Sequence, residues 1–431
     1  MKHKLCLHGL GIKHQAQLLG AVKKLLPACN VKYKVKEEFF KNNDMYKYRM
    51  ARFSPRGGAD LRVSCCFGIM LVRDRLVPLA DVIMEFSPAD KGAVTMIGTL
   101  LRGLLGGKLQ FIVDEPELTR RIDLLRGHYL LDQLEAYDSQ RARTALYCHL
   151  PWQVYTINKT WQEVLEHPLE KSLVRQLRVR LRRLRSVFSL VKPLLPQEDA
   201  MEWLRLFKER TNLLGDAREY DVLLMACAKL NLRQEKGTGH GVPVLSKLLG
   251  DLRKQAAATS IKELRLNAIT AELAGFLLWL YCAPLDKGLS KLTLEEFFSL
   301  RFDKWTHKLL SLPEQYPDGQ DREQLHKIRI KLKRFRYALQ SVPELSVEPQ
   351  LLRSLKYLQD QLGLLHDDYI NCRLLRQLLE EHQQLEELRY EGAMVSGWEQ
   401  ARAETALENL PEQWNNFCTL LVDWHQRIVK N

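Results

Sequence analysis

The feature that most constrains the fold is a pattern of basic and apolar residues that occurs twice, at 175–185 and at 326–336. The first stretch contains six arginines in eleven residues and no acid, and the second repeats the same order of basic and apolar side chains. In both stretches the apolar residues recur at helical spacing, which puts an apolar face beside a cationic face. Two such matching stretches predict a helical bundle that is duplicated within the chain.

The repeat continues beyond the basic stretches. In each half, prolines close the basic helix, an amphipathic helix follows, and a glycine then precedes a cationic and an acidic residue. Aligning Gly215 with Gly363 pairs Arg218 with His366. Each half is therefore predicted to contain a basic helix, a turn, an amphipathic helix, a break at the glycine, and further helices.

The residues before the duplication have a different pattern. Helix-like spacing covers 13–26 and 90–105, and strand-like segments lie at 4–8, 46–53, 61–72 and 81–86. From residue 153 onward almost every window has helical spacing. We therefore predict a mainly α protein: a small α+β domain at 1–112, a helical connector at 113–150 with an amphipathic helix at 117–140, and two pseudo-symmetric helical bundles at 151–431.

Composition limits the partners. Lysine and arginine outnumber aspartate and glutamate by 65 to 52, and the resulting charge of +13 favours an anionic partner. The nine cysteines are scattered without a CxxC pair, which predicts a reducing cytoplasm and no metal finger. The longest apolar run, 273–285, has thirteen residues, whereas about twenty are needed to cross a bilayer. We expect a buried helix there and no membrane partner.

The basic helices each present a cationic row. Its members lie at i, i+3, i+7 and i+10, and extend over about 15 Å of helix. In the first helix the row is Arg175, Arg178, Arg182 and Arg185, and in the second it is His326, Arg329, Lys333 and Arg336. Such a row matches an extended polyanion.

A charge-rich helix is most often only a solvated face, and three features argue against that interpretation here. Solvated faces mix charges of both signs, yet acids are absent from 172–197 and from 324–343. The first row consists of arginine, whose planar guanidinium binds phosphate oxygens in pairs. The cationic rows also flank the apolar faces, which places them along a groove between helices. We predict anion binding, with further candidates at Arg183, Arg218, Arg334, Tyr337 and His366.

The anion is predicted to be inorganic polyphosphate. Nucleic-acid modules usually add exposed aromatic side chains that stack on bases, and the basic stretches offer Tyr337 alone outside the apolar faces. Nucleic acid is therefore disfavoured as a partner, although an RNA-binding module is kept as an alternative. Metal ligation by His326 and His366 is disfavoured because arginine, which cannot bind a metal, stands at the matching positions of the first half. We expect no cofactor, no metal and no catalytic residue.

The repeated segments resemble the CHAD domain (conserved histidine α-helical domain) family. The resemblance is carried by 175–185, 218–222, 326–337 and 362–367. It implies two helical bundles related by a pseudo-two-fold axis, with inorganic polyphosphate bound in a basic central groove and no catalysis. Arg175 stands where the family has a histidine. The resemblance also fits a cytoplasmic protein that associates with polyphosphate granules.

Residues 1–110 resemble a CYTH domain, a triphosphate tunnel metalloenzyme, in the order of their strands and helices. The ExExK signature of that family is missing, because the strand from Lys4 to His8 stands where its metal-binding glutamates would be. The resemblance therefore implies a degenerate domain without activity, and an unrelated α+β domain is the alternative. A triphosphate or polyphosphate hydrolase that uses Asp81 and Glu85 is the rival enzymatic hypothesis.

Overall fold

We analysed a computed structural model of the 431-residue chain, which describes residues 2–9, 14–28, 32–41, 47–56, 59–72, 75–113, 141–234, 241–312, 321–342 and 347–430. The chain forms two compact units, and each is discontinuous in sequence. Unit 1 comprises Met1–His167, Val191–Trp203 and Glu263–Lys291, and unit 2 comprises Pro168–Leu190, Leu204–Lys262 and Leu292–Asn431. The amphipathic helix predicted at 117–140 lies outside the described residues.

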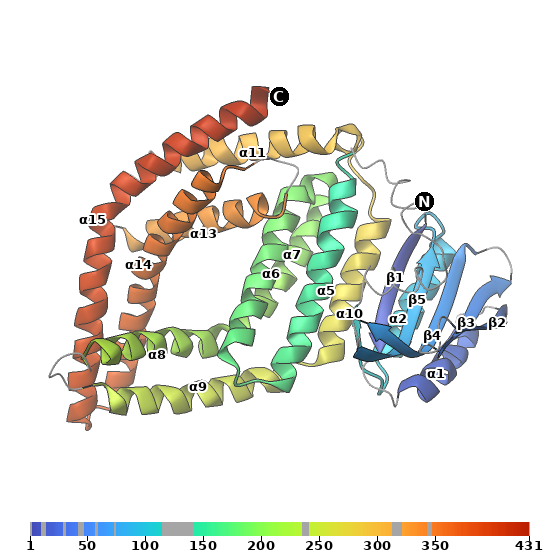
Figure 1. The fold of residues 1–431 in the computed structure, drawn as a ribbon, viewed down its shortest axis with the longest axis horizontal. Helices are drawn as coiled ribbons and strands as arrows, with labels where there is room; N and C mark the ends of the chain where they lie inside the picture. The colour runs from blue at the N-terminus through green and yellow to red at the C-terminus, as the bar shows by residue number, and fades with distance from the viewer. Residues whose placement is uncertain are drawn as a thin grey trace. The chain divides into compact units, whose positions relative to one another are not determined.

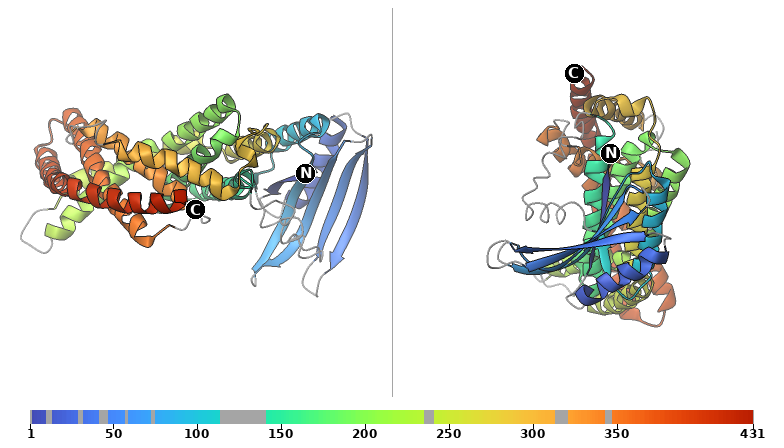
Figure 2. Two further views of the ribbon diagram at one scale, coloured as in Figure 1. Left: turned by 90° about the horizontal axis from the view of Figure 1, so that it is seen from above. Right: turned by 90° about the vertical axis from the view of Figure 1, so that its right-hand side faces the viewer.

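Unit 1 is built on a six-stranded antiparallel sheet with the order β2-β3-β4-β5-β1-β6 (Figures 1 and 2). The strands are β1 (His3–Gly9), β2 (Lys32–Lys41), β3 (Lys47–Arg56), β4 (Leu61–Val72), β5 (Arg75–Phe86) and β6 (Phe111–Val113). Strands β2 to β5 form a meander, and β1 pairs with both β5 and β6. Our sequence analysis did not predict β2, whose charged residues mask its alternation, or β6, which has only three residues.

In the described part of unit 1, four helices pack with the sheet or with one another. They are α1 (His14–Ala28), α2 (Lys91–Leu105), α5 (Thr144–Glu166) and α10 (Leu266–Cys282). Helices α1 and α2 pack on each other and on the sheet, and α10 packs on α2, α5, β1 and β6. The β6 backbone is held by side chains of these helices: the Val113 amide donates to Asn158 Oδ1 at 2.6 Å, and Thr270 Oγ1 donates to the Phe111 carbonyl at 2.8 Å. Helix α10 is the apolar helix that the sequence predicted.

Unit 2 is helical throughout its described part (Figure 1). Its helices are α6 (Lys171–Val191), α7 (Gln197–Asn212), α8 (Gly215–Gln234), α9 (Pro243–Glu263), α11 (Leu294–Leu310), α13 (Arg322–Leu339), α14 (Pro349–Glu381) and α15 (Glu386–Lys430), and the first turns of α7 belong to unit 1. Helices α14 and α15 pack along each other, and α8 packs on both. The predicted fold class, a mainly helical protein with a small N-terminal sheet, is confirmed.

Both predicted basic helices are present as α6 and α13, and each buries its apolar face. In α6 the side chains of Leu177, Leu181, Leu184 and Phe188 are fully buried. In α13 the corresponding Leu332, Phe335 and Leu339 are buried, and Ile328 at the helix start is half-buried. Because the cationic rows adjoin these buried faces, the rows are held at the edge of the core.

The predicted break at Gly363 is wrong. In the first half, Gly215 begins α8 after a turn, but Gly363 lies inside the continuous 33-residue helix α14. A glycine in a helix costs only about 1 kcal/mol, which the packing of α14 on α13 and α15 offsets. A Cβ atom at Gly363 would meet no atom within 4 Å, so the position does not require glycine.

No described helix is both long enough and apolar enough to span a membrane.

Candidate anion-binding site

Unit 2 brings cations from both halves of the duplication together. The centre of this cationic cluster is Arg182 of α6, because its charge acts on groups from three other helices. Burial, and the positive charge of Arg182 and other neighbours, lower the pKa of Arg178, Arg185, Arg218, His326, Arg329, Lys333 and His366. We use the name cationic cluster for Arg182 and these seven residues. Helices α6, α8, α13 and α14 therefore direct basic groups toward one place.

The two histidines of the cluster are in contact. His326, near the start of α13, stacks on His366 of α14 with ring centroids 4.2 Å apart and an angle of 24° between the ring planes. Burial and then the Arg329 charge lower the pKa of His366 to about 3, and the same two causes lower the pKa of His326. His366 is therefore neutral at physiological pH in the free protein.

The acids near the cluster pair mainly with arginines outside it. Glu219 pairs with Arg373 at 3.7 Å, Asp221 with Arg253 at 3.1 Å, and Asp368 with Arg322 at 2.9 Å. These three acids therefore neutralise arginines that are not members of the cationic cluster.

One acid does contact the cluster. Asp367, which is 42 % exposed, lies 3.8 Å from Arg329 Nη2. Within the described part of the chain, this is the only ion pair that involves a member of the cationic cluster. The other members of the cluster form no ion pair within the described part of the chain, so the cluster has an excess of positive charge that an anionic ligand would offset.

Several nitrogen atoms at the site have no hydrogen-bond partner within the protein. They belong to half-buried side chains, and they are Nε of Arg183, Nδ1 of His326, Nε of Arg329 and Nε of Arg336. Buried polar atoms without a partner are uncommon, because each costs about 1–3 kcal/mol. The three guanidinium Nε–H groups are donors, and water or ligand oxygens can accept their hydrogen bonds.

Lys333 has the most strongly perturbed lysine pKa at the site. Burial, followed by the charges of Arg329 and Arg182, lowers its pKa from 10.5 to about 7. Near neutral pH the free protein therefore holds Lys333 partly deprotonated. An anion placed beside the amine would favour its charged form.

Two arginines of α6 also make structural contacts. Arg178 Nη1 donates to the carbonyl oxygen of Thr211 at 2.9 Å, which satisfies a carbonyl at the C-terminal end of α7. Arg183 Nη2 donates to Gln340 Oε1 at 3.5 Å and so links α6 to the end of α13. Neither the Thr211 carbonyl nor Gln340 was expected from the sequence, because both contacts join separate helices.

The other predicted residues lie around the cluster in different environments. Arg175 and Arg334 are exposed. Burial is the main cause that lowers the pKa of Arg185, and the charge of Arg334 is the second. Arg336 is half-buried, and its guanidinium carbon lies 5.5 Å from the ring centroid of Tyr337. Tyr337 is only 7 % exposed, so its ring is not a platform on which a base can stack.

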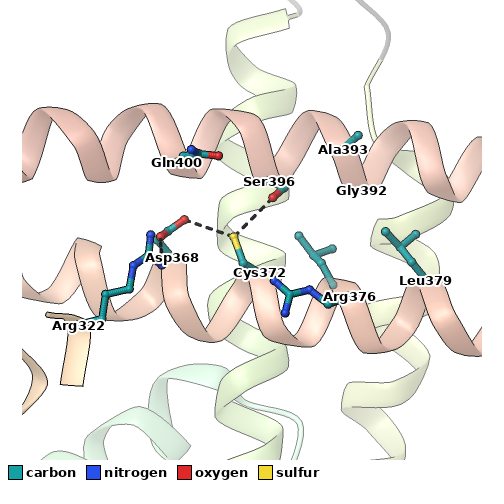
Figure 3. Close-up of a pocket in the computed structure, with 10 residues that line it drawn as sticks. Arg322, Asp368, Cys372, Arg376, Leu379, Gly392, Ala393, Ser396 and Gln400 are labelled. Carbon is teal, nitrogen blue, oxygen red and sulfur yellow. Dashed lines mark hydrogen bonds and ion pairs between the residues drawn. The ribbon is translucent and has the colours of Figure 1, made fainter. Parts of the chain in front are cut away.

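A hollow next to the cluster has different chemistry. It lies between α14 and α15, and Figure 3 shows Arg322, Asp368, Cys372 and Ser396 on its wall. The Cys372 thiol contacts Asp368 Oδ1 at 3.4 Å and Ser396 Oγ at 3.5 Å. Burial raises the pKa of Cys372, so this thiol is not an activated nucleophile. None of the predicted anion-binding residues lines this hollow.

The acids of the rival enzymatic hypothesis lie on β5 of unit 1 opposite basic residues of β1. The strand register pairs Asp81 with His8 and Glu85 with Lys4. The buried Asp81 carboxylate contacts His8 Nδ1, and Glu85 lies 3.4 Å from Lys4 and 3.6 Å from Arg62. Each carboxylate thus faces a basic side chain, which is the reverse of two acids arranged to share a Mg²⁺ ion.

The fold and the repeated basic helices define a duplicated α-helical bundle that follows a small sheet domain in the sequence. The sequence profile of the CHAD domain matches residues 153–376, just over half of the chain, and the chain therefore belongs to the CHAD domain family.

Two solved structures are similar to this chain. The CHAD domain from the plant Ricinus communis is 23% identical, with a TM-score of 0.49, and the match covers 64% of this chain and 93% of that one. PptA from Streptomyces chartreusis is 16% identical, with a TM-score of 0.48, and the match covers 64% of this chain and 99% of that one. The comparison with curated proteins gave no match.

Proposed function

We propose that this protein binds inorganic polyphosphate through the cationic cluster of unit 2. The observation that carries the proposal is the convergence of cations from α6, α8, α13 and α14 with a single ion pair, Arg329–Asp367, among the described residues of the cluster. A polyphosphate chain supplies the negative charge and the acceptor oxygens that this arrangement lacks. CHAD domains are associated with polyphosphate-related proteins, which agrees with the proposal.

The site favours a phosphate chain over RNA. Recognition of single-stranded RNA relies on exposed aromatic side chains that stack on bases. Tyr337 is buried, and the stacked pair of His326 and His366 is partly covered by its neighbours. The cluster therefore offers charge and hydrogen-bond donors, which a chain of phosphates uses fully.

We propose binding rather than catalysis as the activity. The cluster consists of cations that orient and neutralise phosphates, and the nearby Asp221 and Asp368 are occupied by ion pairs with arginines. In unit 1, Asp81 and Glu85 face His8 and Lys4. A degenerate CYTH-like origin of the N-terminal domain and a cytoplasmic location with polyphosphate granules remain predictions from the sequence.

Side-by-side titrations with polyphosphate and single-stranded RNA, at equal phosphate concentration, test the proposed function. We expect polyphosphate to bind more tightly, and its affinity to fall linearly on a logarithmic scale with salt concentration, since cations of the protein replace those around the polyanion. Displacement of polyphosphate by single-stranded RNA at the same phosphate concentration would contradict the proposal. Release of phosphate from tripolyphosphate with Mg²⁺, lost on substitution of Asp81 and Glu85, would support the hydrolase instead.

Replacing Lys333 with methionine is expected to stabilise the free protein and weaken polyphosphate binding. The pKa of Lys333 is lower in the folded than in the unfolded chain, so its charge destabilises the fold below about pH 7. Between about pH 7 and 10.5 the unfolded chain binds more protons, and the stability of the wild-type protein rises with pH through this window. We expect Lys333→Met to gain about 1 kcal/mol at pH 7, or ~2–4 °C in Tm.

Thermal unfolding of both proteins at pH 7 and pH 9.5 measures this effect. The difference in Tm between Lys333→Met and the wild type should shrink at the higher pH, where Lys333 of the folded wild type has lost most of its charge. Lys356→Met, at an exposed lysine of α14, is the matched control and should leave the difference near zero at both pH values. Equal unfolding temperatures of wild type and Lys333→Met at pH 7 would contradict the buried-charge interpretation.

A further inference from the structure

Unit 2 contains a second group of chemically active side chains, none of which belongs to the cationic cluster. Asp303 and His307 lie one turn apart on α11, and His425 lies on α15. One ligand atom from each of the three lies within 4.8 Å of those from the other two. Among the described residues, this is the one group of three or more His, Cys, Asp or Glu side chains with such spacing.

The geometry of the group resembles that around a metal ion. His425 Nε2 lies 2.7 Å from Asp303 Oδ1, and His307 Nε2 lies 3.3 Å from the same oxygen. Ligand atoms around a tetrahedral Zn²⁺, with bonds of about 2.0–2.1 Å, are separated by about 3.3 Å. Both imidazoles point the same nitrogen toward one carboxylate, so a single ion between them needs only a small outward shift of His425.

The helices hold these three side chains firmly. Phe302, next to Asp303, and Trp424, next to His425, are both fully buried and pack edge to face with ring centroids 5.7 Å apart. Phe335 of α13 lies 5.6 Å from Phe302 and completes the aromatic cluster. Because the neighbouring residues are anchored in the core, the backbones that carry Asp303 and His425 are fixed relative to each other.

The group is also open to solvent. The His425 side chain is 14% exposed, that of Asp303 36%, and that of His307 68%. An ion can therefore enter from solution, and water can complete its coordination. Two imidazoles and one carboxylate favour a divalent transition metal such as Zn²⁺ over Mg²⁺ or Ca²⁺, which prefer oxygen ligands.

We propose that Asp303, His307 and His425 form a binding site for a divalent transition metal of the Zn²⁺ type. The alternative is a structural arrangement in which both histidines only donate hydrogen bonds to Asp303. The metal ion would link α11 to α15 and so stabilise the packing of these two helices. This site does not depend on polyphosphate binding.

Calorimetric titration of the full chain with Zn²⁺, in the absence of polyphosphate, tests the proposal. We expect the wild type to bind one equivalent of Zn²⁺. His307→Ala should abolish this binding or lower the Zn²⁺ affinity by more than the ~10–100-fold that is typical of losing an outer-shell partner. His307 is largely exposed, so this variant should remain folded. His167→Ala, at an exposed histidine outside the group, is the matched control and should retain the equivalent.

A second measurement separates a metal site from hydrogen bonding alone. Zn²⁺ should raise the Tm of the wild type and of His167→Ala, and should leave that of His307→Ala unchanged. Co²⁺ should give a visible absorption band that also requires His307. Identical Zn²⁺ titrations of wild type and His307→Ala would overturn the proposal, as would loss of the equivalent in the His167→Ala control.

Discussion

Reversing the charges of Arg182 and Arg329 together is expected to lower the affinity for polyphosphate at least about 100-fold. A hydrogen bond to a charged group contributes about 1.5–3 kcal/mol, so losing two of them changes the binding free energy by about 3–6 kcal/mol. Arg182 is the shared neighbour of the cationic cluster, and Arg329 is 14% exposed beside it. Equilibrium binding of polyphosphate at several salt concentrations measures the loss, and the salt dependence should become weaker.

The control for this double variant is Arg205→Glu with Arg353→Glu. Both arginines are exposed on unit 2, on α7 and α14, and their replacement changes the net charge by the same amount. This control variant should bind polyphosphate with an affinity within a few-fold of that of the wild type. Arg182→Gln with Arg329→Gln removes the two charges without reversing them. Circular dichroism should be used to test that each variant is folded. Wild-type affinity in a folded Arg182/Arg329 variant would exclude the cluster as the binding site.

Asp221→Ala is expected to destabilise unit 2 by about 3–5 kcal/mol, the usual cost of leaving one partner of a buried ion pair unpaired. Asp221 of α8 and Arg253 of α9 are both almost completely buried, at 1% and 5% side-chain exposure, and lie 3.1 Å apart. The unpaired Arg253 would be left in the core. Chemical denaturation should show a lower midpoint, and binding should weaken because α8 also carries Arg218.

A second substitution distinguishes loss of the ion pair from simple loss of volume. Asp221→Leu with Arg253→Met removes both charges and keeps apolar packing between α8 and α9, so we expect it to recover most of the stability. Glu219→Ala is the control on the same helix, because its pair with Arg373 is solvent-exposed and contributes about 1 kcal/mol or less. Equal stability of Asp221→Ala and wild type would show that the pair is not important for the fold.

The helical repeat and its buried faces could be predicted because they rest on local periodicity. Leu177, Leu181 and Leu184 recur at helical spacing, and burial of that face then fixes the direction of the adjoining arginines. The stacking of His326 on His366 was not predicted, because it joins α13 to α14. The sequence therefore supplied the residue types of the proposed site, and its contacts came from the packing of separate helices.

The partners of the acids could not be predicted in the same way. Arg253, Arg322 and Arg373 pair with Asp221, Asp368 and Glu219, and these pairings depend on how separate helices pack. Gly363 aligns with Gly215, which begins a helix after a turn, yet the packing of α14 overrides the weak local preference of glycine at 363. The metal-like group was missed for a related reason: only Asp303 and His307 share a helix, and His425 comes from α15.

The ion pair between Asp367 and Arg329 of the cationic cluster has a consequence for ligand size. The Asp367 carboxylate lies 3.8 Å from Arg329 and so occupies one position that an anion could take. Because this carboxylate is part of the same chain, its effective concentration at Arg329 is high. A single free phosphate must displace it and gains few other contacts. A long chain reaches several cations at once, and each bound unit raises the local concentration of the next. We infer that Asp367 acts as a built-in competitor that favours multivalent ligands over orthophosphate.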